Sequence, residues 1–138
     1  MIPQQSIGVA NVSNGLSNVD GILGVGPVDL TQGTVSNTNT VPTVTDNLLS
    51  QGTISEEVLG VYFVPASELL NDGSLTFGGY DETVVTSSVD YVPLTTTSPA
   101  STFWGINQSI SYGSTTILSS TAGIVDTGTT LILIATGK

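Results

Sequence analysis

The sequence contains no cysteine, no histidine and no arginine, and its one basic side chain is Lys138. Without histidine or cysteine the chain offers no zinc-binding cluster, and neither a serine–histidine nor a cysteine–histidine pair can perform catalysis. The absence of cysteine also removes disulfides, so the sequence does not indicate a redox compartment. Carboxylates and hydroxyls are therefore the candidate reactive groups, and we expect no metal and no cofactor.

Positive charge is almost absent, because eleven acidic residues stand against one lysine and the formal net charge is −10. A nucleic-acid-binding protein needs Lys and Arg side chains to neutralise phosphates, and an anionic membrane surface attracts the same residues. The longest aliphatic run, Leu131 to Ala135, is also far too short to span a bilayer. The sequence therefore predicts neither a nucleic-acid partner nor a membrane partner.

Short apolar segments separated by Gly, Ser, Asn and Pro make up most of the chain. Val61 to Val64 is a β-branched and aromatic run that Pro65 ends, which is typical of a strand. Period-two alternation, which also indicates strands, is found at Ile7 and Val9, at Leu75 and Phe77, at Trp104, Ile106, Ile110 and Tyr112, and at Ala122, Ile124 and Asp126. The pattern predicts a protein built mainly from β-strands.

One short helix is predicted over residues 43–51. Pro42 and Thr43 form a typical helix start, and Gly52 is a typical C-terminal stop. A small apolar face is formed by Val44, Leu48 and Leu49. A helix of about two turns is marginal alone, so we expect it to pack on the strands.

The candidate site lies within residues 122–131, where an apolar strand ends in the carboxylate of Asp126. Because apolar runs flank Asp126 on both sides, we expect its carboxylate to be buried. A buried charge is costly unless it is hydrogen-bonded or paired, so this carboxylate needs donors. Thr127, Thr129 and the backbone N–H of Gly128 are the expected donors, and they would favour the ionised form. An Asx turn between two strands would produce the same short motif, so the motif alone leaves both interpretations open.

Several segments together resemble the pepsin-like aspartic protease family, and Ile124 to Leu131 resembles its second active-site motif. The other matching segments are Asp20 to Gly26, Pro42 to Gly52, Gly73 to Gly79 with Asp81, Tyr91 to Leu94 and Phe103 to Ile106. They follow the family's order and approximate spacing over nearly the whole chain. The resemblance is closest to the cysteine-free basidiomycete type.

The resemblance implies an all-β fold, as a fragment of the bilobal pepsin-like architecture with one short helix near residues 43–51. Residues 1–79 would be the C-terminal part of the N-terminal lobe, and residues 80–138 the inter-lobe crossover and the start of the C-terminal lobe with the second catalytic loop. The first catalytic strand and the flap would precede Ser6, and most of the C-terminal lobe would follow Ala135. Apolar faces that pack on those parts would then be uncovered, which predicts poor solubility.

The resemblance also implies an acid endopeptidase, in which two aspartates share one proton and activate a water molecule. Asp126 would be one of the two, with Thr127, Gly128 and Thr129 as its supporting loop. Thr127 would make bonds between the lobes, and Thr129 would donate to the Asp126 carboxylate. The residues expected to contact substrate are Gly128, Thr130, Ile22 and Ile124. For Ile22 and Ile124, ordinary core packing is an equally good interpretation.

An intact enzyme of this family carries two Asp-Thr/Ser-Gly motifs, and this sequence carries one. We therefore expect the isolated chain to be inactive. The intact protein is expected to be secreted and monomeric, to cleave peptide or protein substrates and to bind pepstatin-like inhibitors, although this chain shows no signal peptide. The two glycosylation sequons, Asn11-Val12-Ser13 and Asn107-Gln108-Ser109, add weak support for secretion.

Two other interpretations remain. The first is a protease-like domain that binds peptides or inhibitors without catalysis. The second is a Ser/Thr-rich β-domain of a cell surface, which explains the composition but not the ordered motifs. An upstream Asp-Thr-Gly-Ser motif and a flap tyrosine in the full-length transcript would favour the enzyme.

Overall fold

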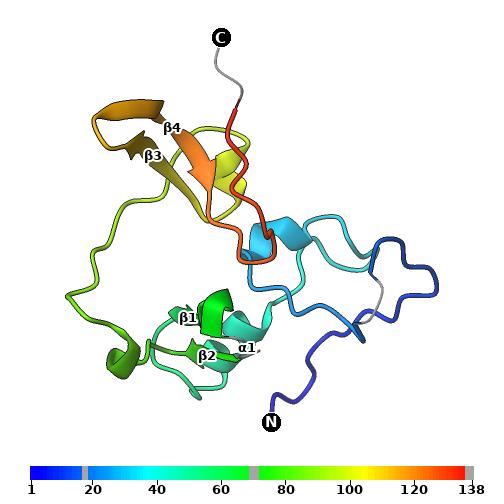
Figure 1. Cartoon of the computed structure of the whole chain (residues 1–138). Helices are drawn as coiled ribbons and strands as arrows, with labels where there is room; N and C mark the ends of the chain where they lie inside the picture. Colours follow the sequence, from blue (N-terminus) through cyan, green and yellow to red (C-terminus); the bar gives the residue numbers. More distant parts are fainter. Residues whose placement is uncertain (17–18, 69–71, 136–138) are drawn as a thin grey trace. The chain divides into compact units, whose positions relative to one another are not determined.

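The computed structural model describes residues 1–16, 19–68 and 72–135. The chain forms two compact units, Met1–Val89 and Asp90–Lys138. The first contains helix α1 and strands β1 and β2, and the second contains strands β3 and β4 (Figure 1). Strands dominate and one short α-helix is present in the described part of the chain, which confirms the predicted all-β fold class. The assignment of residues 1–79 and 80–138 to two protease lobes stays a prediction.

Helix α1, Val44–Ser50, lies within the predicted range 43–51 and is one residue shorter at each end. Thr43 and Asp46 form a reciprocal capping box: the Thr43 hydroxyl accepts from the Asp46 N–H, and the Asp46 carboxylate accepts from the Thr43 N–H at 2.6 Å. At the other end Gly52 has a φ of 68°, which favours glycine. The N–H groups of Gly52 and Thr53 donate to the carbonyls of Leu49 and Leu48, the Schellman pattern that closes a helix.

Strands β1, Leu59–Phe63, and β2, Gly73–Phe77, pair antiparallel in the first unit. Leu59 lies opposite Phe77 and Phe63 opposite Gly73, so the ladder covers the whole of both strands. These strands confirm the predictions made from Val61 to Val64 and from Leu75 and Phe77. Short 3₁₀ helices occur at η1 Val28–Thr31, η2 Ala66–Glu68, η3 Glu82–Val84 and, in the second unit, η4 Ala100–Thr102.

Strands β3, Gly105–Tyr112, and β4, Thr115–Ile124, form an antiparallel hairpin (Figure 1). Its two-residue loop contains Gly113 with a φ of 58°, the left-handed conformation that such tight loops require. The register shifts on both sides of Ile110, so the hairpin contains a β-bulge irregularity. The predicted alternation of Ile106, Ile110 and Tyr112 thus lies in a real strand.

The predicted strand at Ile7 and Val9 is wrong in this structure. Ile7 and Val9 lie in an irregular segment, and their side chains are 81% and 93% exposed. Tyr91 to Leu94 is likewise irregular, apart from an isolated bridge between Leu94 and Ile106. A strand is stabilised by a hydrogen-bonded neighbour, and among the described residues neither segment has a paired strand along its length.

Buried residues are few: in the described ranges they are Thr95, Ala100 and Gly105, all in the second unit. Large apolar side chains such as Phe63, Tyr91 and Ile132 are exposed. The expected uncovered apolar faces are therefore present, while poor solubility stays a prediction. Among the described residues, no helix has the length and apolar character that crossing a membrane requires.

Gly105 is the tightest point of this small core, and we expect Gly105→Ala to destabilise the second unit. A Cβ at position 105 would collide with the Ala100 carbonyl and lie 2.9 Å from Thr95 Cγ2. Overpacking of this kind costs about 1–3 kcal/mol. Urea unfolding followed by the fluorescence of Trp104, the single tryptophan, measures the loss. The exposed substitution Ser111→Ala on the same strand is the control, and equal stability of both variants would contradict the prediction.

Candidate functional site

The β3–β4 hairpin positions Asp126. The register places Gly105 opposite Ile124, the last residue of β4. Pairing continues by one further bond, because the Val125 N–H donates to the Trp104 carbonyl at 2.9 Å. Asp126 follows directly, so its backbone is anchored by the sheet on one side and released into a turn on the other.

Both carboxylate oxygens of Asp126 accept hydrogen bonds from the following turn. The Gly128 N–H donates to Oδ1 at 2.9 Å, and the Thr129 hydroxyl donates to Oδ2 at 2.5 Å. The backbone closes the same turn through a 3.4 Å bond from the Thr129 N–H to the Asp126 carbonyl. The two donors predicted at Gly128 and Thr129 are therefore in place. A Cβ at position 128 would lie 3.3 Å from Oδ1, so glycine gives the carboxylate its close approach to the backbone.

These bonds favour the ionised form of the Asp126 carboxylate. The Thr129 hydroxyl, and after it the Gly128 N–H, hold the pKa of Asp126 below its ordinary value, while slight desolvation acts in the opposite direction. The ionised form is the one that accepts protons. The turn therefore favours a carboxylate that is available as a base.

The predicted burial of Asp126 is wrong for this chain. Its side chain is exposed, and so are the apolar residues on both sides: Val125 is 54%, Leu131 70% and Ile132 85% exposed. Apolar flanks bury a charge only when other residues pack on them, and here most of the surface of these side chains stays open. The hydrogen bonds predicted from Gly128 and Thr129 nevertheless form, because the turn supplies them without any burial.

Asp81 has the same local chemistry and sets a useful standard of comparison. Its Oδ1 accepts from the Thr83 N–H at 2.9 Å and from the Thr83 hydroxyl at 2.6 Å, and these bonds also lower its pKa. A lowered pKa in a Thr-containing turn is therefore not specific to a catalytic residue. Asp126 differs in that both oxygens are engaged and in the apolar runs around it.

The remaining predicted residues of the second unit are exposed: Thr127, Thr130 and Ile124, which ends β4. Their predicted roles in bonds between lobes and in substrate contacts, together with that of Gly128, stay predictions. No group of three or more acidic side chains that could hold a metal ion occurs in the described part of the chain.

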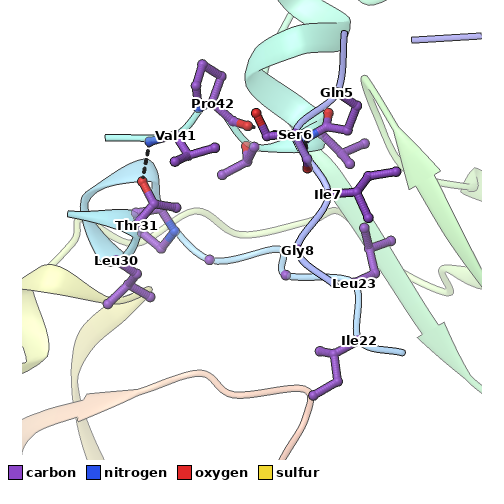
Figure 2. Close-up of a pocket in the computed structure, with 15 residues that line it drawn as sticks. Gln5, Ser6, Ile7, Gly8, Ile22, Leu23, Leu30, Thr31, Val41 and Pro42 are labelled. Atoms are coloured by element: carbon purple, nitrogen blue, oxygen red, sulfur yellow. Dashed lines mark hydrogen bonds between the residues drawn. The ribbon is translucent and has the colours of Figure 1, made fainter. Parts of the chain in front are cut away.

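Ile22 lies in the first unit, where it lines a groove of about 600 Å³. Figure 2 shows residues that line the groove, which come from the segments 5–8, 22–31 and 41–44; they include Gln5, Ile7, Ile22, Leu23, Leu30 and Pro42. The groove is mainly apolar, which suits either interpretation of Ile22, as a substrate contact or as a packing residue.

Hydrogen bonds between residues that are separated in the sequence connect the segments that line the groove, and the sequence patterns did not predict them. The Asn47 amide donates to Gln5 Oε1 at 2.9 Å, which ties the N-terminal segment to α1. The Val41 N–H donates to the Thr31 hydroxyl at 2.7 Å, the bond dashed in Figure 2. Amide and hydroxyl pairs of this kind leave no periodic signal, so a single sequence does not reveal them.

We expect Thr129→Val to raise the pKa of Asp126, because it removes the hydroxyl donor that contributes most to the lowering. A carboxyl with a depressed folded pKa contributes stability above its unfolded pKa and loses it as pH falls through the folded value. In the variant Asp126 should therefore protonate at a higher pH. The contribution of its lowered pKa to the free energy of unfolding should be reduced. Carboxyl ¹³C NMR titration measures the shift. Thr129→Ser keeps the hydroxyl and should leave the pKa of Asp126 lowered, and Thr83→Val should raise the pKa of Asp81 alone. An unchanged pKa of Asp126 in Thr129→Val would contradict the assignment.

Comparison with known proteins gives consistent matches over the whole chain. The family model described as eukaryotic aspartyl protease matches residues 1–138. Polyporopepsin of Irpex lacteus is 63% identical over 97% of this chain and 41% of its own length. Rhizopuspepsin of Rhizopus chinensis is 39% identical, with 91% of this chain and 29% of the relative covered, and mouse gastricsin is 29% identical, with 96% and 33% covered.

A solved structure matches equally well. The crystal structure of the aspartic proteinase from Irpex lacteus superposes with a TM-score of 0.92 at 62% identity, covering 97% of this chain and 41% of that chain. The chain therefore spans less than half the length of the curated relatives it matches.

Proposed function

The chain belongs to the eukaryotic aspartyl protease family, and on that premise we propose that it is a segment of an acid endopeptidase in which Asp126 is one of two catalytic carboxylates. The observation that carries the proposal is the turn after β4, where both oxygens of an Asp-Thr-Gly aspartate accept hydrogen bonds. A 63% identical relative named polyporopepsin supports the same chemistry.

The reaction needs a second carboxylate close to the first. Two adjacent carboxylates cannot both ionise, so they share one proton, and their pKa values belong to the pair. One member takes a proton from a water molecule as the water oxygen bonds to the peptide carbonyl carbon, and the other donates a proton to the carbonyl oxygen. The turn that favours ionised Asp126 supports its part in this pair.

Neighbouring residues have supporting roles in the proposal. Thr129 holds the carboxylate, and Thr127 joins the two catalytic loops of the intact protein. Gly128 and Thr130 bind the substrate backbone, while Ile22 and Ile124 line pockets on either side of the scissile bond. Apolar pocket walls suit a substrate with hydrophobic residues at the cut.

The second carboxylate has no evident source within this chain. None of the other ten acidic residues is followed by Thr-Gly or Ser-Gly, so the sequence carries one active-site motif of this kind. We therefore propose that the isolated chain is inactive. The same observation favours the second candidate, a protease-like domain that binds peptides without cleaving them.

A chimera in which this chain is inserted into a relative distinguishes the endopeptidase from the peptide-binding domain. Residues 1–138 would replace the matching 41% of polyporopepsin, so that the relative supplies the other catalytic loop. Cleavage of a denatured protein at acid pH, sensitive to a pepstatin-like inhibitor, supports the enzyme. A folded chimera that binds the inhibitor without cleavage supports the binder. Secretion, a monomeric state and the absence of a cofactor complete the proposal, and are tested on the full-length protein.

A further inference from the structure

The proposed catalysis makes no use of the two Asn-X-Ser sequons, and they lie in contrasting parts of the structure. Asn11-Val12-Ser13 lies in an irregular segment of the first unit, and Asn107-Gln108-Ser109 lies inside strand β3. Both asparagine side chains are solvent-accessible, so exposure alone does not distinguish them. What distinguishes them is how firmly the structure holds each one.

The hairpin fixes Asn107 through its backbone and its side chain. It pairs with Ala122 in the ladder, and its Oδ1 accepts a 2.8 Å hydrogen bond from the hydroxyl of Thr95. Thr95 is itself buried, and its N–H donates to the Gly105 carbonyl. Any change in the backbone or side-chain conformation of Asn107 that a transferase requires would have to break the ladder pairing and the Thr95 bond.

Asn11 has no such restraint among the described residues. Its segment belongs to no strand or helix, and no hydrogen bond between described residues involves its side chain. The flanking Val9 and Val12 are also exposed. Acceptor sequons lie in surface loops, and this exposed segment outside strands and helices is of that kind.

We propose that Asn11 is an N-glycosylation site and that Asn107 is not. The glycosyl donor is an oligosaccharide linked to a polyprenyl diphosphate. The Asn11 amide nitrogen forms a bond to C1 of the first sugar, the bond between C1 and the diphosphate oxygen breaks, and the amide loses one proton. The glycan would place a hydrophilic group among the exposed apolar side chains of residues 7–12.

Timing favours the same assignment during synthesis. A β-hairpin forms in about 1–10 μs, whereas a ribosome adds roughly 5–20 residues per second. Asn107 is therefore free for only about one to three seconds before β4 is complete and the hairpin closes. Asn11 stays accessible throughout and afterwards.

The test uses the full chain behind a heterologous secretion signal in yeast, so it does not depend on protease activity. We expect a single glycan, seen as a mass decrease after endoglycosidase H treatment of cells and medium together. Asn11→Gln and Ser13→Ala should abolish it, and Asn107→Gln should leave it unchanged. A glycan lost in Asn107→Gln, or two glycans, would overturn the proposal.

Two further variants test the reasoning. A C-terminal extension carrying Asn-Gly-Thr shows that the chain met the transferase, so modification of the extension with Asn11 bare contradicts the proposal. Gly113→Val opposes the positive φ of the hairpin loop. We expect it to release Asn107 and add a second glycan. A still bare Asn107 in this variant would show that the hairpin is not what protects it.

Discussion

Asp126→Asn in the polyporopepsin chimera should lower kcat/KM for peptide cleavage by about 10²–10⁴-fold or more, the contribution of a positioned acid–base group. Asparagine keeps the size of the side chain and can accept the Thr129 or Gly128 bond through its one carbonyl oxygen. It neither takes a proton from water nor shares one with a second carboxylate. The loss should therefore fall mainly on kcat, measured at acid pH with a chromogenic peptide.

Asp81→Asn is the matched control for this experiment. Asp81 also accepts hydrogen bonds in a Thr-containing turn and also has a lowered pKa, but it has no proposed part in catalysis. We expect it to retain most of the chimera's activity, with circular dichroism confirming that both variants fold. Equal losses in the two variants would show that the substitution acts through the turn structure, and the catalytic assignment would then be wrong.

Local rules predicted the helix and parts of both strands of the hairpin. Helix α1 follows from a capping threonine just before its first residue and a terminating glycine two positions after its last, signals that lie next to the helix in the sequence. Strands β3 and β4 contain the predicted alternation at Ile106, Ile110 and Tyr112 and at Ala122 and Ile124, whereas their pairing through the turn at Gly113 was not predicted. Such elements carry their own boundary signals and need few distant residues to form.

Predictions that depended on distant partners fared worse. The alternation at Ile7 and Val9 indicates a strand with one buried face, but the described residues provide no paired strand and no cover. The burial of Asp126 failed for the same reason, because its apolar flanks are exposed. A pattern in one sequence shows which face is apolar, and does not show what packs on it.

The site was predicted to the extent that it is local. The bonds from Gly128 and Thr129 to Asp126 span three residues, and the motif alone indicated them. The Gln5–Asn47 bond that holds the groove spans 42 residues and had no signal. The roles of Thr127, Thr130, Ile22 and Ile124 depend on surfaces beyond the local turn, and so they stay predictions.

The isolated 138-residue chain should show no inhibitor-sensitive peptide hydrolysis, at least about 10²–10⁴-fold below the chimera at equal concentration. A single carboxylate has no partner with which to share a proton, and exposed Asp126 exchanges its proton with bulk water instead. The assay is acid cleavage of a denatured protein with and without a pepstatin-like inhibitor, and the chimera is the positive control.

Turnover by the isolated chain would have one distinctive form. Two copies could each contribute Asp126, and the activity would then rise with the square of the chain concentration and vanish in Asp126→Asn. The exposed apolar side chains of Leu131, Ile132 and Leu133 make self-association physically reasonable. Association through these residues does not by itself bring two carboxylates within hydrogen-bonding distance, so we expect aggregation without activity. Inhibitable, second-order turnover would refute this expectation and make the dimer the catalytic unit.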